Sequence, residues 1–274
     1  MEAAQYHVAP PSGTHVRLKD VPLGEWYPLL MQWQVPVLIS ATYTALALAF
    51  SARVGNTPRQ AAKKKKKTGL TPMSLAVFVH NAALAAYSAW AFWSVFPPFV
   101  GKILHRGLHE GLCDTDGELW NSVLFVHLYL FYVSKYYELM DTAIILLKGR
   151  KASLLQIYHH AGVILIMHLA NYTASPSSIF IVWENAGVHT VMYSYYALTT
   201  LGINPPGKQY LTSLQIFQFL FGQTAALLYF FRSGCATPLQ GIWPWALTAY
   251  LLPLIYLFVQ FFYKTYGPKP IKAE

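Results

Sequence analysis

The sequence has little charge and no sign of a cleavable leader. Only 11% of its 274 residues are Asp, Glu, Lys or Arg, whereas a soluble domain carries about 25% charged residues. Too little charge is present to cover a solvated surface, which argues against a soluble protein. Residues 1–27 lack an apolar core of the kind that a signal peptide has. No internal repeat is visible, which argues against a repeat architecture.

Hydrophobic residues are instead abundant, at 55% of the chain with a mean hydropathy of +0.34, and they form long runs without alternation. A bilayer span needs roughly 20 mainly apolar residues, and backbone groups in lipid must pair within a helix or a closed barrel. We therefore predict an all-α integral membrane protein with seven transmembrane helices, in which the long third block is tilted, broken or partly outside the hydrocarbon. The blocks are 28–50, 73–97, 120–146, 154–171, 176–200, 209–231 and 241–263.

The basic residues predict the orientation. Arg53, Arg59 and Lys63–Lys67 lie between the first two blocks, and cytoplasmic loops are enriched in Lys and Arg. Seven spans then place most of the 20 basic residues in the cytoplasm. The net charge of +9 is explained by topology and anionic lipid headgroups, and no motif indicates nucleic-acid binding. The predicted parts are a lumenal segment 1–27, a membrane domain 28–264 and a cytoplasmic tail 265–274.

The two cysteines test this topology. Cys113 and Cys235 fall in connections that are both predicted to be lumenal, and that compartment is oxidising. We predict a Cys113–Cys235 disulfide, with two unpaired thiols as the alternative. Asn171-Tyr172-Thr173 is a glycosylation sequon on the same side, but it abuts a span and is expected to be unused.

Ionisable groups inside a membrane are costly and usually mark function. Lys135, Glu138 and Asp141 follow one another at intervals of three, with Thr142 next, so they are neighbours on a helix. A helix-end ion pair that holds the bundle together is the structural alternative. Even then, two acids beside one lysine leave surplus negative charge, which can orient or charge a nearby histidine.

A histidine pair lies in the fourth block. Gln156, His159 and His160 stand at positions i, i+3 and i+4 and so share one helix face. A lone histidine in a membrane is usually a packing residue. Two adjacent histidines with a glutamine one turn earlier indicate function.

Two further polar stripes occupy later blocks. The first consists of Asn185, His189, Met192, Tyr193 and Tyr196. Interhelical hydrogen bonding would explain most of this stripe, but it explains His189 less well. The second stripe, Thr212, Gln215 and Gln218, is weak evidence for a functional site when taken alone, and His80 in the second block is ambiguous.

Together these motifs resemble the ELO (ELOVL) family of very-long-chain fatty acid elongases. The run from Lys135 to Thr142 is similar to the family's KxxExxDT box, and His159-His160 to its HxxHH box. Asn185–Tyr196, Thr212–Phe219 and His80-Asn81 resemble further family signatures. Gln156 replaces the first histidine of HxxHH, a variant that looks like polyunsaturated-fatty-acid elongases of microalgae and fungi.

The resemblance implies the condensing step of fatty acid elongation in the endoplasmic reticulum membrane. An acyl-CoA and malonyl-CoA give a 3-oxoacyl-CoA two carbons longer, CO2 and CoA, without a cofactor or metal. It also implies that six of seven helices form a barrel around an acyl tunnel, with CoA entering from the cytoplasm. Other enzymes of the elongation cycle, and a second copy of this chain, are partners that the resemblance leaves open.

Catalytic roles follow from the residue chemistry and the family pattern. The cysteines are predicted to be lumenal, so attack on the thioester falls to a histidine. The family pattern suggests His159, which would form an acyl-imidazole, while His160 and His189 stabilise or protonate oxyanions; exchanging His159 and His189 fits the sequence equally well. Gln156 and Asn185 are expected to hold the imidazoles. The supporting residues are Lys135, Glu138, Asp141, Thr142, Met192, Tyr193, Tyr196, Gln215 and Gln218.

Phosphates of CoA need cationic groups at the entrance. Lys148, Arg150 and Lys151 follow the acidic box on the predicted cytoplasmic face, and Lys208 lies on that face too. We predict that these four bind CoA. Their alternative role is to set topology alone.

Two other functions compete with this one. A membrane di-iron desaturase or hydroxylase also uses histidine boxes, and His105-x-x-x-His109 is present, but a second HxxHH box is missing and this pair is predicted to lie in a lumenal loop. A seven-helix receptor or transporter would explain the spans. It does not explain the histidine pair, the acidic box and the Asn/His/Tyr stripe together.

Overall fold

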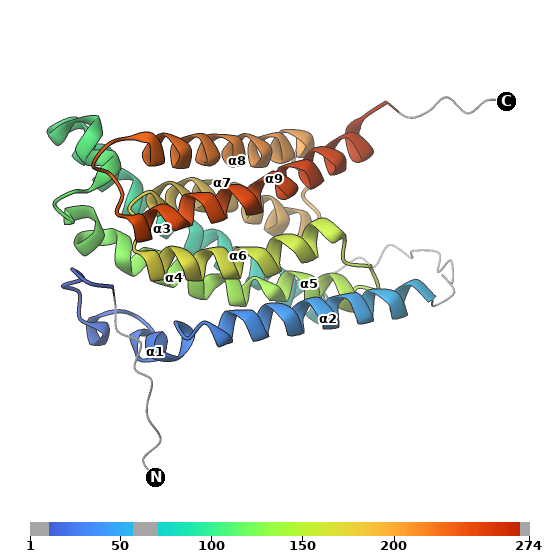
Figure 1. Ribbon diagram of the computed structural model, residues 1–274. Helices are drawn as coiled ribbons and strands as arrows, with labels where there is room; N and C mark the ends of the chain where they lie inside the picture. The colour runs from blue at the N-terminus through green and yellow to red at the C-terminus, as the bar shows by residue number, and fades with distance from the viewer. Residues whose placement is uncertain (1–10, 57–70, 269–274) are drawn as a thin grey trace, which may run out of the picture.

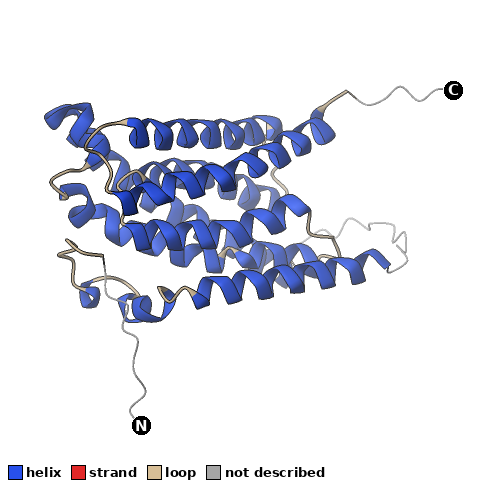
Figure 2. Cartoon of the chain, viewed as in Figure 1, coloured by secondary structure: helices blue, strands red, loops and turns tan. Residues whose placement is uncertain are grey.

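The computed structural model describes residues 11–56 and 71–268, and this part of the chain is helical without a strand (Figures 1 and 2). The basic tract Lys63–Lys67 and Arg59, which carry much of the orientation argument, lie outside the described residues. The main elements are α1 (Tyr27–Leu30), α2 (Gln34–Asn56), α3 (Pro72–Cys113), α4 (Phe125–Tyr137), α5 (Leu139–Leu147), α6 (Leu154–Thr173), α7 (Ser178–Thr200), α8 (Lys208–Phe231) and α9 (Pro238–Tyr266).

Each apolar block of the sequence overlaps at least one of these helices. Four of them, α2, α3, α8 and α9, are long and apolar enough to cross a membrane. The prediction of a helical, multi-pass membrane protein is therefore confirmed. The third block is broken, as one of the predicted alternatives had it, because α4 ends at Tyr137 and α5 begins at Leu139.

Packing between helices closes a ring. α3 packs along α7, α7 on α8, α8 on α9, α9 on α6, α6 on α4, and α4 returns to α3. α2 lies outside this ring, against α6 and α5 (Figure 1). The connections alternate between the two ends of the bundle, so α5–α6 and α7–α8 share one end, and α6–α7 and α8–α9 share the other. Side chains from distant segments consequently meet inside the ring.

Helix α3 is longer than predicted. It begins at a capping box made by Thr71 and Ser74, and its continuous part before Gly107, residues 72–106, corresponds to about 52 Å, well over the roughly 30 Å of hydrocarbon. We predicted a connection after residue 97, but the helix continues past Pro97 and Pro98 because its apolar face stays buried, Phe99 being 4% exposed. The helix breaks only at Gly107, where φ is +85°.

The end of α3 is tied to the α8–α9 connection. Cys113 and Cys235 form a disulfide with Cα atoms 4.5 Å apart, and we call this the disulfide end of the bundle. Buried Lys102 donates to Asp114 at 2.5 Å and also to Asp116. The hydrogen bond that the Lys102 ammonium donates to Asp116 holds the pKa of the Asp116 carboxyl below its usual value.

Asn171 of the sequon is 1% exposed. Its amide donates to the carbonyl oxygens of Met167 and Leu128, at 2.8 and 3.4 Å. Glycan transfer needs an accessible amide, so this burial supports the expectation that the sequon is unused.

Loss of the disulfide should lower stability without removing the site. The bridge joins residues 122 apart, and removing a native disulfide typically costs about 2–5 kcal/mol. We expect the Cys113→Ser/Cys235→Ser variant to melt at a lower temperature than the parent protein in the same detergent. Reductant should lower the melting temperature of the parent protein and leave that of the double variant unchanged. An equal melting temperature for both proteins without reductant would contradict the prediction.

Candidate functional site

The ring encloses a cavity of about 480 Å³ that opens between the α5–α6 and α7–α8 connections, which we call the open end. Side chains from five helices of the ring and from α5 reach it, and they come from every polar group found in the sequence. The predicted site residues that line it are Glu138, Asp141, Gln156, His159, His160, Asn185, His189, Met192, Tyr193, Tyr196, Gln215 and Gln218.

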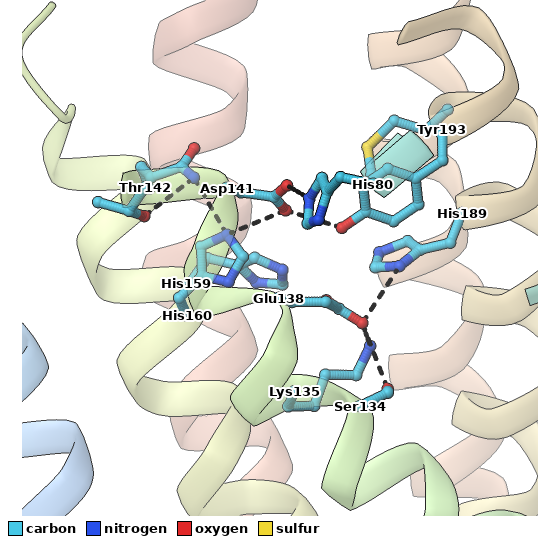
Figure 3. Close-up of polar contacts among 12 residues, drawn as sticks. His80, Ser134, Lys135, Glu138, Asp141, Thr142, His159, His160, His189 and Tyr193 are labelled. Atoms are coloured by element: carbon cyan, nitrogen blue, oxygen red, sulfur yellow. Dashed lines mark hydrogen bonds and ion pairs between the residues drawn. The ribbon is translucent and has the colours of Figure 1, made fainter. Parts of the chain in front are cut away.

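Glu138 forms one centre of the cavity wall. It lies at the break between α4 and α5, and its Oε1 accepts from Lys135 Nζ at 2.7 Å. Both side chains are almost fully buried, at 2% and 1% exposed. His189 Nδ1 of α7 lies 3.9 Å from the same oxygen (Figure 3). The predicted ion pair is present, and its negative member faces a histidine.

Asp141 forms the second centre. His80 of α3 places Nε2 2.8 Å from Oδ1, and the Tyr193 hydroxyl donates to Oδ2 at 2.8 Å. His160 Nε2 lies 4.0 Å from Oδ2 (Figure 3). One carboxylate therefore holds side chains from α3 and α7 and faces a histidine of α6. His80 is a site residue that the sequence marked only weakly, through a histidine within an apolar block.

Gln156 connects the histidine pair to Thr142. Its Nε2 lies 3.1 Å from His160 Nε2 and 3.2 Å from Thr142 Oγ1. The hydroxyl of Tyr43 on α2 is 2.8 Å from the same Thr142 oxygen. Gln156 thus contacts His160, one of the imidazoles that it was expected to hold, while Tyr43 belongs to no motif and was missed.

His159 stands between two cavities. It lines the large one and also an inner cavity of about 30 Å³, whose walls are mainly apolar side chains of α6, α7 and α9. Its Nδ1 lies 3.0 Å from the hydroxyl of Tyr250 on α9. Glu184, a further buried acid, also lines the inner cavity at 9% exposed. His159 therefore borders an open polar cavity and a small, mainly apolar one.

Three of the four predicted CoA-binding residues are at the cavity mouth. Lys148, Arg150 and Lys208 line it and are exposed, which gives the open end a positive rim. Lys151 is exposed but does not line the cavity. The structure thus separates one cation from the other three.

Asn185 was expected to hold an imidazole, but its Oδ1 atom accepts a hydrogen bond from Lys135 at 3.5 Å. The supporting residue Gln215 donates to the sulfur of Met192 at 3.2 Å. Among residues 11–56 and 71–268, one cluster brings three atoms of metal-ligand type together: His109, Cys113 and Cys235. Its two sulfurs are joined in the disulfide, and His105 is not part of it.

Comparison with known proteins agrees with these motifs. The ELO family model, described as the GNS1/SUR4 family, matches residues 28–274. Very long chain fatty acid elongase 4 of Homo sapiens is 36% identical over 217 residues, covering 73% of this chain and 65% of the relative. Fatty acid elongase sre1 of Dictyostelium discoideum is 31% identical over 216 residues, covering 77% and 79%.

Very long chain fatty acid elongase 3 of Homo sapiens is 33% identical over 177 residues, which are 63% of this chain and 64% of the relative. The matched region is thus slightly less than two thirds of the length of both human relatives. The family match nevertheless extends through all the helices from α2 to α9. The chain therefore belongs to the ELO family, a family of fatty acid elongases.

Proposed function

We propose that this protein is a 3-oxoacyl-CoA synthase that condenses a long-chain, polyunsaturated acyl-CoA with malonyl-CoA. The products are a 3-oxoacyl-CoA two carbons longer, CO2 and CoA. The observation that carries the proposal is the place of His159, between an open cavity with a cationic rim and an inner apolar cavity. An acyl-CoA has these two chemistries on either side of its thioester.

The reaction runs in two stages. His159 attacks the thioester, the C–S bond breaks, and CoA leaves as a thiolate that takes a proton from solvent. Decarboxylation of malonyl-CoA then gives an enolate that attacks the acyl-imidazole carbon and displaces His159. His160 and His189 stabilise the oxyanions of both stages, and the carboxylates of Asp141 and Glu138 lie beside them.

The polyunsaturated substrate is proposed from the QxxHH variant. Gln156 supplies a hydrogen bond to His160 where the common box has a histidine. We further propose that all seven helical segments span the endoplasmic reticulum membrane, with the disulfide end in the lumen and the open end in the cytoplasm. That orientation puts the cationic rim in the compartment that holds CoA thioesters.

The test is condensation by purified protein in the presence of a chelator. Radiolabelled malonyl-CoA would be supplied with saturated and polyunsaturated acyl-CoAs, and products identified by mass. A 3-oxo product two carbons longer supports the proposal, and the preferred acyl-CoA tests the polyunsaturated assignment. If no acyl-CoA is extended and the protein holds iron before chelation, the desaturase-like function is favoured instead.

The cationic rim should control substrate affinity. We expect Arg150→Ala and Lys208→Ala to raise the KM for malonyl-CoA or acyl-CoA about five- to tenfold, because each loses one partly solvated contact with phosphate. The turnover number should change little. Lys151→Ala is the matched control, since Lys151 is close in sequence but does not line the cavity. Equal kinetics for all three variants would show that these residues set topology alone.

A further inference from the structure

His159 is held by a residue from far along the chain. Tyr250 of α9 is 9% exposed, and its hydroxyl oxygen lies 3.0 Å from His159 Nδ1 and 3.1 Å from the His159 carbonyl oxygen. One hydroxyl group therefore contacts both the ring and the main chain of the same residue. Tyr250 belongs to none of the sequence motifs.

The two contacts determine where the protons lie. A phenol has one hydrogen to donate, and a carbonyl oxygen only accepts. If the Tyr250 hydroxyl donated to Nδ1, its lone pairs would face the carbonyl oxygen of His159 at 3.1 Å without a hydrogen between them. Only the opposite arrangement satisfies both contacts: Tyr250 donates to the carbonyl oxygen, and His159 Nδ1–H donates to Tyr250.

A neutral imidazole carries one N–H, so a proton on Nδ1 leaves Nε2 with its lone pair. Among the described residues, Nε2 of His159 has no hydrogen-bond partner, and the side chain lines both cavities. We infer that Tyr250 is a positioning residue that fixes His159 in the Nδ1–H tautomer and leaves Nε2 as the nucleophile. This inference rests on the acyl transfer proposed above for His159.

The chain on either side of His159 is shaped to hold this tyrosine. A Cβ at Gly162 would lie 2.3 Å from Tyr250 Cε2, so the ring can approach α6 only because residue 162 is glycine. Tyr158 stacks on the same ring, with ring centroids 5.6 Å apart, and its hydroxyl donates to the Tyr250 carbonyl oxygen at 3.1 Å. The Tyr250 ring is thus in contact with the residues one before and three after His159.

This contact also serves the first chemical step. When Nε2 bonds to the acyl carbon and the C–S electron pair leaves with CoA, the ring becomes positively charged while Nδ1 keeps its hydrogen. The Tyr250 oxygen accepts that hydrogen bond and stabilises the charged ring. Without the hydroxyl, the ring loses both this partner and its preference for the reactive tautomer.

The test is release of CoA from acyl-CoA alone, in a single turnover by full-length protein in detergent. We expect Tyr250→Phe to slow release by about 10-fold or more, and by less than the roughly 10⁴-fold found where a triad carboxylate fixes the tautomer. The KM for acyl-CoA should stay within about twofold, since substrate binding is unaffected. The matched control is Tyr129→Phe, which removes a buried hydroxyl that donates to Leu23 at 2.8 Å, away from both cavities.

Release by Tyr250→Phe at the parental rate, with His159→Gln inactive, would overturn the positioning role alone. Release by His159→Gln at the parental rate would overturn the proposed acyl-histidine itself. A second measurement needs no Tyr250 variant: ¹⁵N spectra of histidine-labelled protein, with His159 identified by its loss in His159→Gln. We expect a protonated Nδ1 and an unprotonated Nε2, and the reverse pattern would overturn the inference.

Discussion

Replacement of His159 by glutamine is expected to lower the rate of condensation by about 10³-fold or more, because the variant lacks the nitrogen that is proposed to carry the acyl group. Glutamine keeps a polar side chain of similar reach but has no nucleophilic nitrogen. The rate would be measured as labelled 3-oxoacyl product at saturating acyl-CoA and malonyl-CoA. Parental condensation by His159→Gln would contradict the mechanism.

The same assay without malonyl-CoA distinguishes the two histidines whose roles the sequence leaves exchangeable. His159→Gln should release no CoA from acyl-CoA, whereas His189→Gln should still release one turnover, more slowly than the parent, and should form much less product, because it keeps the nucleophile and loses one oxyanion-stabilising group. The opposite pattern would assign the acyl group to His189. His168→Gln is the control, because His168 lies on the same helix but contacts the carbonyl oxygen of Met31 at 3.1 Å and lines neither cavity.

Hydropathy located the helices well because lipid leaves the backbone no other partner than its own helix. It placed the ends of α6, α7 and α8 within two residues, but it missed the end of α3. The second apolar block was predicted to end at residue 97, yet Lys102 beyond it is buried by its bonds to Asp114 and Asp116. Such contacts with the next segment are invisible in a local hydropathy pattern.

The contacts of the site also fall into those that the sequence predicts and those that it does not. Contacts within one helix or across a short break follow from spacing, as in Lys135–Glu138 and Gln156–His160. His80–Asp141 and His159–Tyr250 join residues 61 and 91 positions apart. They depend on which helices are neighbours in the ring and how each is rotated. An apolar run specifies neither the neighbours of a helix nor its rotation, so Tyr250 could not be distinguished from the other tyrosines of α9.

Replacement of Lys135 by methionine is expected to destabilise the fold by about 3–5 kcal/mol, because it leaves the Glu138 carboxylate buried without its cation. Lys135 is 1% exposed and donates to Glu138 at 2.7 Å. Methionine fills a similar volume, so lost packing contributes little. The measurement is the temperature of thermal unfolding in detergent, and Lys264→Met, at an exposed position on α9, should leave it unchanged.

The double variant Lys135→Met/Glu138→Gln separates charge from packing. With both charges gone, the penalty for an unpaired carboxylate disappears, and most of the lost stability should return. Activity should not return with it, because Glu138 Oε1 also lies 3.9 Å from His189 Nδ1 and a neutral amide cannot place negative charge there. Recovery of stability without activity would mean that the pair serves the histidine as well as the bundle. Recovery of both would reduce Lys135 and Glu138 to the helix-end ion pair that their spacing alone predicts.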